Sequence, residues 1–326
     1  MNLQLLLDTL ADGQFHSGES LGEAQGVSRA AVWKQLKKLE ALGLECHSVR
    51  GRGYRIPGGI NLLKRAEFEA QLSTVAASAL ADISLALILD STNRVALEQA
   101  QRGGGHGQLY LAEQQTAGRG RRGRVWVSPF ARNLYFSLTW SFAGGAAALE
   151  GLSLVVGLAL LQGLVGEGIE GVQLKWPNDL LYQGKKLAGV LLEMSGDASG
   201  QCQVVIGVGV NVAMPEDMAV DVDQPWIDLQ QIAAKPLDRN RILAALVNAL
   251  VPALQQFALQ GFAPFREAWS QHNAYQGQAV RIATESFSVQ GDCLGVDAGG
   301  ALLLATDQGI KAFYGGELSL RLLDDA

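Results

Sequence analysis

Four arginines and three glycines occupy residues 118–124 (GRGRRGR), in a chain whose formal net charge is −6. Arginine presents a planar fork of N–H donors to carboxylate or phosphate oxygens, and its charge does not titrate away. Glycine lets the backbone approach a ligand closely and adopt positive φ. The segment predicts a loop that closes over an anion, and the same spacing is also compatible with a solvated charged loop or a nuclear-localisation-like basic run.

Three further motifs place polar groups where predicted strands begin or end. Residues 90–93 (DSTN) lie where a strand gives way to a helix, so they are expected as helix caps and also offer hydroxyl and amide groups to a polar ligand. In residues 175–179 (KWPND) a lysine ends a strand, and Asp179 suits a Mg²⁺–phosphate group, with a structural turn as the alternative. In residues 184–189 (GKKLAG), Lys185 or Lys186 can direct its ammonium group at a carboxylate or phosphate.

Residues 207–211 (GVGVN) end another predicted strand with glycines and an amide. They do not form a GxGxxG fingerprint, and no Walker A sequence occurs anywhere in the chain. This argues against a Rossmann or P-loop nucleotide site.

The composition indicates a multidomain protein of a reducing compartment. A chain of 326 residues, 48% hydrophobic and 18% charged, allows two or three domains with a sizeable core. The three cysteines and four histidines are scattered, which predicts no disulfide framework, no zinc site and no protein-held transition metal. No basic segment precedes the apolar N-terminus, and the apolar stretch 152–161 is too short to span a bilayer. We therefore expect a cytoplasmic protein without a membrane segment.

Residues 1–60 predict a winged helix-turn-helix. Leucines recur at helical spacing in residues 3–10, and Ser17 and Ser28 are placed to cap two further helices. The third helix would be the recognition helix, and a hairpin around the basic residues 50–53 would form the wing.

The charge of this unit favours DNA binding over a structural appendage. Residues 27–58 carry seven basic and two acidic side chains, a local net charge of +5. Localised positive charge on an acidic protein is typical of phosphate contacts. Because one such module binds weakly and specific sites normally need two half-sites, DNA binding also predicts a dimer. The expected DNA-contacting residues are Ser28, Arg29, Trp33, Lys34, Lys37, Arg50 and Arg52.

The rest of the chain predicts an α+β multidomain fold. A boundary at residues 57–59 precedes a connecting helix over 64–72. Strands are predicted at 85–89, 109–112, 133–140, 172–175, 187–193 and 204–210, and helices at 94–101, 149–165 and 239–260. They suggest a mixed sheet covered by helices on one face. Glycine-separated strands after residue 278 suggest a small SH3-like β-barrel. The predicted domains are 1–60, 61–272 and 273–326.

The order of these motifs resembles that of biotin–protein ligases. The resemblance rests on the motifs STN (91–93), QTAGRGRRGR (115–124), KWPND, GKKLAGVL (184–191) and GVGVN. With the winged helix attached, the chain resembles the bacterial bifunctional biotin–protein ligases that also repress the biotin operon. The likeness runs from HSGE (16–19) and SRAA (28–31) to Gly315-Gly316-Glu317. It implies a class II synthetase-like central domain and an SH3-like C-terminal barrel.

The resemblance implies two half-reactions without a covalent enzyme intermediate. The biotin carboxylate attacks the α-phosphate of Mg·ATP to give biotinyl-5′-AMP, and a lysine of a biotin carboxyl carrier protein then attacks the mixed anhydride. Bringing two anions together requires clustered cations. Further implied partners are operator DNA of biotin genes and a second copy of the chain, with dimerisation promoted by biotinyl-5′-AMP.

The resemblance also assigns roles to individual residues. Catalysis is implied for Lys186, Arg121, Lys175 and Asp179, with Mg²⁺ carried by ATP near Asp179. Biotin binding is implied for Ser91, Thr92, Asn93, Gln115, Gly118, Arg119, Gly120, Arg121 and Lys186. ATP or adenylate binding is implied for Arg119, Arg121, Trp126, Lys175, Asn178 and Asn211. Two positions, Gln114 and Thr116, depart from a close relative's pattern outside the central motif.

Three alternatives compete with a bifunctional ligase and repressor. The first is a lipoate–protein ligase, whose catalytic domain is related in fold. The second is a transcription factor that senses biotin with an inactive ligase domain. The third is a ligase whose DNA-binding domain is non-functional.

Overall fold

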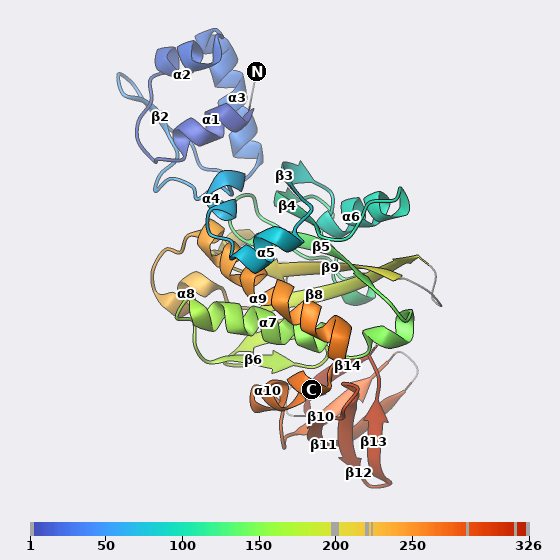
Figure 1. Ribbon diagram of the computed structural model, residues 1–326. Coiled ribbons are helices and arrows are strands. Elements are labelled where there is room, and N and C mark those ends of the chain that lie inside the picture. The colour runs from blue at the N-terminus through green and yellow to red at the C-terminus, as the bar shows by residue number, and fades with distance from the viewer. Residues whose placement is uncertain are drawn as a thin grey trace.

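The computed structural model describes residues 3–196, 202–218, 222, 224–284, 287–315 and 318–323. It arranges the chain in three successive units: a helical N-terminal unit, a central sheet with helices, and a C-terminal group of strands at the far end (Figure 1). The central unit lies between the other two.

The N-terminal unit has the predicted winged helix-turn-helix order. Helices α1 (Leu3–Leu10), α2 (Gly18–Gln25) and α3 (Arg29–Ala41) precede the hairpin β1 (His47–Val49) and β2 (Gly53–Arg55). The Ser17 and Ser28 hydroxyls accept hydrogen bonds from the backbone N–H groups of Ser20 and Ala31, so both predicted caps are confirmed. Gly53 has φ +104°, and a Cβ there would collide with the backbone of His16, so only glycine fits where the wing passes α2.

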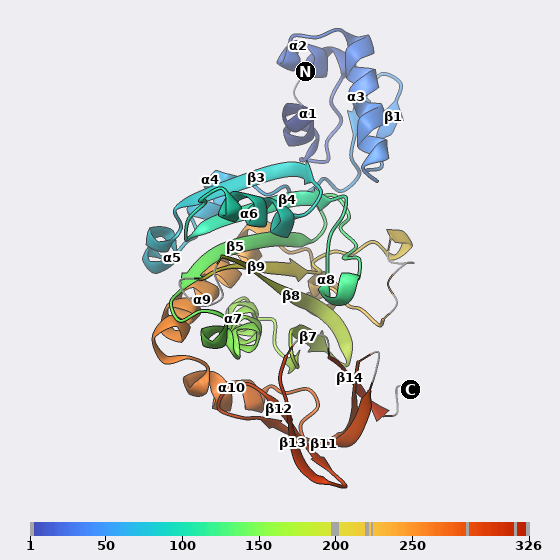
Figure 2. The ribbon, with the colours of Figure 1, turned by 90° about the vertical axis from the view of Figure 1, so that its right-hand side faces the viewer.

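The core of this unit extends beyond its own chain segment. Buried leucines of α1, α2 and α3 pack with Leu62, Phe130 and Ala131, and with Leu87 of the first central strand. Phe130 is the sixth residue after the arginine loop, and Ala131 follows it. In Figure 2 the N-terminal unit stands against the β3 side of the central sheet. The chain that follows the loop is therefore anchored in the N-terminal core at Phe130 and Ala131.

The central sheet is mixed, as predicted. Its strands are β3 (Asp82–Leu89), β4 (Gln108–Gln115), β5 (Leu134–Phe142), β6 (Val172–Lys175), β7 (Asp179–Tyr182), β8 (Lys185–Gly196) and β9 (Cys202–Val210). They follow the order β3-β4-β5-β9-β8-β7-β6, with β3 and β4 parallel and the other pairs antiparallel. Strand β7, which pairs with β6 and β8, was not predicted, because residues 177–179 were interpreted as a turn.

The expectation of helices on one face only is wrong. Helices α7 (Leu152–Gly166) and α9 (Arg239–Gln260) lie side by side over one face (Figure 1). Helix α6 (Thr92–Gln101) packs on β4, β5, β8 and β9 from the opposite side: Ser137 of β5 contacts α6, whereas its neighbours Phe136 and Leu138 join the core under α7 and α9. The packing face of α6 begins with the polar residues Thr92 and Asn93 and continues with Ala96, which packs on Tyr110 and Val205.

Helices α7 and α9 are long and apolar enough to span a membrane by composition, in the ranges Ala146–Gly166 and Arg239–Gln260. Both pack against each other and the sheet, and α7 is buried on nearly every side. A helix that is apolar all round is expected at such a central position in a folded core. Their composition is thus explained by packing within the protein.

The segment joining the first two units contains α4 (Arg65–Glu69) and α5 (Thr74–Ala79) in place of the single helix predicted over 64–72. A buried ion pair holds this segment: Arg239 Nη2 lies 2.6 Å from Glu113 Oε2, and the two side chains are 2% and 1% exposed. The Arg239 guanidinium also donates to the Asn61 and Asn133 carbonyls, and Glu113 accepts from Leu63 N–H. The pair therefore fixes the connection to the central sheet.

After α8 (Leu229–Ala233), α9 and α10 (Arg266–Gln271), the chain enters the C-terminal unit. Strands β10 (Ala279–Ala283), β11 (Ser288–Val296), β12 (Leu302–Thr306), β13 (Gly309–Phe313) and β14 (Ser319–Leu322) form an antiparallel sheet in the order β13-β12-β11-β10-β14. This agrees with the predicted small β domain. Of the motif 315–317, Gly316 and Glu317 lie outside the described residues.

Candidate functional site

A row of polar side chains lies where α6 meets β4. Thr92 donates from its backbone N–H and its hydroxyl to Gln115 Oε1, at 2.9 and 3.2 Å. Gln115 Nε2 donates to Ser128 Oγ at 3.2 Å. Ser91 occupies the N-cap position and is buried, but within the described chain its side chain makes no capping hydrogen bond. The DSTN motif thus contributes more than a helix cap: it builds a buried polar wall.

Asn93 is held by three neighbours. Its Nδ2 donates to Glu193 Oε2 at 2.8 Å and to the Leu191 carbonyl at 3.3 Å, and its Oδ1 lies 2.5 Å from Ser137 Oγ. A Cβ on Gly207 of β9 would lie 2.0 Å from Asn93 Oδ1. Only glycine at position 207, the first glycine of GVGVN, leaves space for this amide.

The second glycine of GVGVN makes room for Trp126. A Cβ on Gly209 would lie 2.4 Å from the indole ring, and one on Gly189 would lie 3.1 Å from it. Lys186 Nζ is 5.5 Å from the centroid of the same ring. The indole N–H of Trp126 is buried and has no hydrogen-bond partner among the described residues, which suits a donor that awaits a ligand.

Cationic side chains cluster around Asp179, beside Trp126. Lys186 Nζ lies 2.8 Å from Asp179 Oδ1, and the two side chains are 16% and 14% exposed. The neighbouring Lys185 is exposed, so the structure selects Lys186 as the lysine that faces this cluster. Lys175 lies nearby, with its Nζ 5.7 Å from the ring centroid of Tyr275. Among the described residues, Lys186 and Lys175 thus both lie near Asp179.

Burial, followed by neighbouring charges, lowers the pKa values of two cations in this region. Burial lowers the pKa of Lys175; Asp179 partly offsets this, and the charges of Lys186, Arg321 and Arg124 lower it further. Burial likewise lowers the pKa of Arg121. Asp179 partly offsets that effect, and the charges of Arg122 and Arg124 add to it. The cluster is therefore suited to hold a polyanion such as a phosphate chain.

The arginine loop forms a small closed hairpin over this region. Trp126 N–H donates to the Gly118 carbonyl at 2.9 Å, and Gly120 N–H donates to the Arg124 carbonyl at 2.8 Å. Its tip, Arg121–Gly123, is a 3₁₀ turn. A Cβ on Gly118 would lie 2.4 Å from the Trp126 carbonyl oxygen, so glycine is needed where the two arms meet. The loop is therefore a defined structural element.

Two of the loop arginines contact the rest of the protein. Arg121 Nη1 donates to Asn178 Oδ1 at 2.8 Å, and its Nη2 is 3.4 Å from the Leu318 carbonyl of the C-terminal unit. Arg119 Nη2 lies 2.9 Å from Glu193 Oε2. Arg122 and Arg124 are exposed. The four arginines thus divide into two that join the loop to its surroundings and two on its surface.

Asn211 lies behind Lys186. Its Nδ2 donates to the carbonyls of Lys186 and Ile227, at 3.4 and 3.2 Å. Lys186 also pairs through its backbone with Pro225 and Ile227. Asn211 therefore holds the backbone at Lys186 and at Ile227, beside the lysine cluster.

The structure brings the predicted biotin and adenylate residues together around Trp126 and the arginine loop. It adds side chains that sequence reasoning missed: Ser128, Ser137, Glu193 and Arg321. No local motif marks Ser137 or Glu193, because each lies inside a strand. Arg321, on β14, comes from the far end of the chain.

The predicted DNA-contacting residues are all exposed on the N-terminal unit. Arg29, Trp33 and Lys37 follow at four-residue spacing on α3 and are exposed, whereas Val32 and Leu36 are buried. Lys34 is exposed beside them, and Arg50 and Arg52 are exposed on the wing, with the Arg52 guanidinium 4.3 Å from the centroid of the Phe15 ring. Ser28 is exposed and caps α3. An exposed basic helix next to a basic wing is the arrangement expected for major-groove binding.

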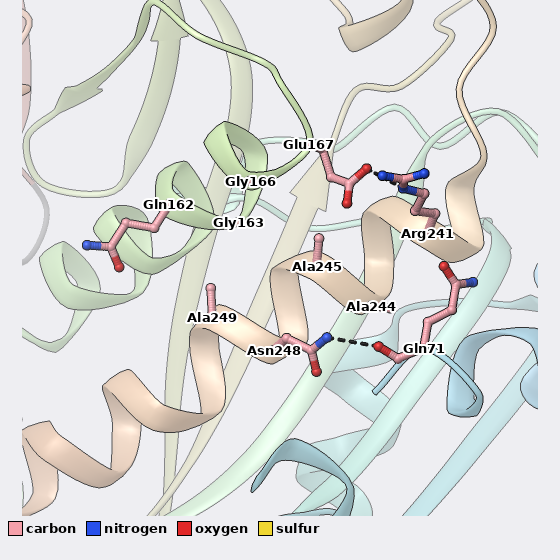
Figure 3. Close-up of a pocket in the computed structure, with 10 residues that line it drawn as sticks. All are labelled: Gln71, Gln162, Gly163, Gly166, Glu167, Arg241, Ala244, Ala245, Asn248 and Ala249. Atoms are coloured by element: carbon pink, nitrogen blue, oxygen red, sulfur yellow. Dashed lines mark hydrogen bonds and ion pairs between the residues drawn. The ribbon is translucent and has the colours of Figure 1, made fainter. Parts of the chain in front are cut away.

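A shallow hollow lies elsewhere, between α7 and α9 (Figure 3). It is bounded by small residues such as Gly163 and Ala245, and at its rim Arg241 Nε lies 2.5 Å from Glu167 Oε2. A Cβ on Gly163 would lie 2.9 Å from the Ala245 carbonyl oxygen, so the small residues serve close helix packing. None of the predicted site residues lines it. Among the described residues, no group of three or more His, Cys, Asp or Glu side chains is placed to hold a metal ion.

Comparison with known proteins agrees with this layout. The Biotin/lipoate A/B protein ligase family matches residues 85–211, an HTH domain matches 2–55, and the Biotin protein ligase C terminal domain matches 275–321. The Bifunctional ligase/repressor BirA of Escherichia coli is 41% identical over 316 residues, covering 97% of this chain and 96% of that protein. The Bacillus subtilis protein of the same name is 32% identical, with 95% of each chain covered.

A solved structure is similar as well. The biotin protein ligase of Aquifex aeolicus in complex with biotin and ATP superposes with a TM-score of 0.64 at 29% identity. The match covers 74% of this chain and 100% of that one.

Proposed function

This chain belongs to the biotin protein ligase family in its bifunctional ligase/repressor form, and on that premise we propose that it biotinylates a carrier protein and represses transcription. The reaction joins biotin and ATP to give biotinyl-5′-AMP and then transfers the biotinyl group to a lysine of a biotin carboxyl carrier protein. The observation that carries the proposal is the continuity of the neutral polar wall with the cationic cluster, through Trp126 and the arginine loop. A ligand with an uncharged polar head and a reacting carboxylate requires such a site.

Biotin binds along the polar wall in this proposal. Ser91, Thr92, Asn93 and Gln115 receive its uncharged polar head. Lys186 receives the carboxylate at the other end of the site. Trp126 packs against the adenine side, and its indole N–H is available to the ligand. Gly118 and Gly120 let the loop backbone come close to the adenylate.

The first half-reaction forms a bond between the biotin carboxylate oxygen and the α-phosphorus of ATP, while the bond to pyrophosphate breaks. Lys186 and Arg121 offset the charge that develops on the α-phosphate, and Lys175 and Asn178 hold the phosphate chain. Arg119 and Arg121 close the loop over the product and exclude water from the anhydride. In the second half-reaction the carrier lysine attacks the biotinyl carbonyl carbon and AMP leaves.

Asp179 fits a role beside ATP-bound Mg²⁺. Mg²⁺ prefers one or two carboxylates together with phosphate oxygens, and Asp179 is the carboxylate within the lysine cluster. The metal would supply charge neutralisation of the phosphates. The residues therefore suit a metal that enters with its nucleotide.

The ligase proposal is tested by incubating the purified chain with ATP, Mg²⁺, a carrier domain and either biotin or lipoate. We expect biotin-dependent formation of biotinyl-5′-AMP and a carrier mass increase on one lysine. If pyrophosphate exchange required lipoate and did not occur with biotin, lipoate would be the substrate and the protein would be a lipoate–protein ligase. Absence of any carrier labelling would favour a biotin sensor with an inactive ligase domain.

The second activity is repression of biotin genes through the N-terminal unit. The exposed face formed by α3 and the wing supports DNA binding, and Ser28, Arg29, Trp33, Lys34, Lys37, Arg50 and Arg52 would make the contacts. We propose that biotinyl-5′-AMP promotes a homodimer that binds two half-sites, in a cytoplasmic protein divided at residues 60 and 272. Footprinting of a biotin-gene operator with and without biotinyl-5′-AMP tests this. No protection in either condition would leave a ligase with a non-functional DNA-binding domain.

A further inference from the structure

Glu193 connects two parts of the site that the proposed mechanism treats separately. One oxygen, Oε2, lies 2.9 Å from Arg119 Nη2 of the arginine loop and 2.8 Å from Asn93 Nδ2 of the polar wall. The three residues come from β8, from the loop and from α6. The pairs are separated by 74 and 100 positions in the sequence, so only the fold brings them together.

The contact at Glu193 is one link in a longer chain of hydrogen bonds. Ser137 Oγ lies 2.5 Å from Asn93 Oδ1 and 2.7 Å from Thr92 Oγ1. Thr92 continues the chain to Gln115, Gln115 to Ser128 Oγ, and Ser128 to the Trp126 carbonyl. The chain therefore leaves the loop at Arg119, passes through the residues of the polar wall and returns to the loop at Trp126.

We propose that Glu193 is a positioning residue that holds the arginine loop closed by joining Arg119 to Asn93. This inference rests on the proposed function. A ligand that orders Asn93 orders the Glu193 carboxylate, and the carboxylate in turn orders Arg119. Charged partners make such hydrogen bonds shorter and roughly twice as strong as neutral ones.

The placement of Glu193 also avoids conflict with the reaction. Lys186 and Glu193 are seven residues apart on β8, which separates their backbones by roughly 23 Å along the strand. The Lys186 ammonium reaches as far as Gly189, and the Glu193 carboxylate lies beyond it, on the side of Asn93. A negative side chain at the Lys186 end would instead compete with the substrates.

The test is the rate at which biotinyl-5′-AMP leaves the protein. Glu193→Gln keeps an acceptor oxygen for Asn93 but removes the charge that holds Arg119. We expect release about fivefold faster than in the wild type, the upper end for a partly exposed ion pair, with the KM for ATP little changed. Arg119→Gln should also speed release, and the double variant should release no faster than the Arg119 single variant.

A matched control is available at the hollow in Figure 3. Glu167→Gln breaks a comparable arginine–glutamate pair with Arg241 far from the polar wall, so the release rate should not change. Thermal melting of each variant establishes that it is folded.

The outcomes separate the two proposals. If the wild type makes and retains biotinyl-5′-AMP but Glu193→Gln releases it at the wild-type rate, the role of Glu193 is refuted and the ligase function stands. Multiplied effects in the double variant would mean that the two side chains act independently, which also refutes the inference. A wild type that forms no biotinyl-5′-AMP overturns both.

Discussion

Substitutions at two glycines of one strand should affect biotin binding and ATP binding separately. Gly207 and Gly209 are two residues apart on β9, so they face the same side of the sheet. A Cβ on Gly207 would meet the Asn93 amide at 2.0 Å, and a Cβ on Gly209 would meet the Trp126 ring at 2.4 Å. Gly207→Ala should therefore impair the biotin side, and Gly209→Ala the adenine side.

The expected magnitudes follow from the contacts that are lost. In Gly207→Ala the Asn93 amide must leave its positions beside Ser137, Leu191 and Glu193. Biotin binding would have to return the Asn93 amide to its position, and at about 1 kcal/mol for each lost hydrogen bond this costs roughly 3 kcal/mol. The biotin Kd should therefore increase about a hundredfold. In Gly209→Ala the displaced indole loses its stacking, which is worth about 1–3 kcal/mol for a base and predicts roughly a tenfold increase in the KM for ATP.

Isothermal titration with biotin and pyrophosphate-exchange kinetics with varied ATP measure the two effects. Gly166→Ala on α7 is the control, because nothing lies within 4 Å of its added Cβ. The reasoning fails if folded Gly207→Ala binds biotin within about threefold of the wild type. It also fails if both variants weaken biotin and ATP equally.

Three further predictions address charge and stability. Burial lowers the pKa of Lys175, so its ammonium loses its proton at lower pH than an ordinary lysine does. In a pH profile, the kcat/KM for adenylation should therefore begin to fall below pH 10.5. Lys175→Arg should move this alkaline decrease to higher pH. Glu113→Ala leaves Arg239 buried without its partner and should destabilise the protein by about 3–5 kcal/mol in chemical denaturation; a loss under 1 kcal/mol would contradict a structural role. Lys34→Ala should weaken operator binding and reduce the salt slope by about one, measured by titration at several salt concentrations.

Elements with clear start and stop signals were predictable from the sequence. Helix α9 has its predicted bounds because Asp238 caps its start and Gly261 ends it. Strand β6 also has its predicted bounds. Strand β7 was missed because it is four residues long and begins at the last residue of KWPND, whose Pro177 indicates a turn. Its existence depends on pairing with β6 and β8, which local sequence does not report.

The site was predictable where residue type and position coincide. Thr92, Asn93 and Lys186 lie at element ends, where a polar side chain between apolar runs is conspicuous. Ser137 and Glu193 lie inside strands and look like ordinary alternation. Their importance depends on partners distant in sequence, and nothing in the spacing encodes those contacts.

The glycines of GVGVN show the same limit most clearly. The sequence predicts a strand that ends in two glycines, but it does not say what fills the space above them. The structure fills one space with the Asn93 amide and the other with the Trp126 ring. Because alternate residues of a strand are roughly 7 Å apart, the strand sets the distance between the amide that faces biotin and the wall that faces adenine. A larger residue at Gly207 would displace Asn93 on the biotin side, and one at Gly209 would displace Trp126 on the adenine side. Strand β9 therefore determines how the two substrates are positioned relative to each other.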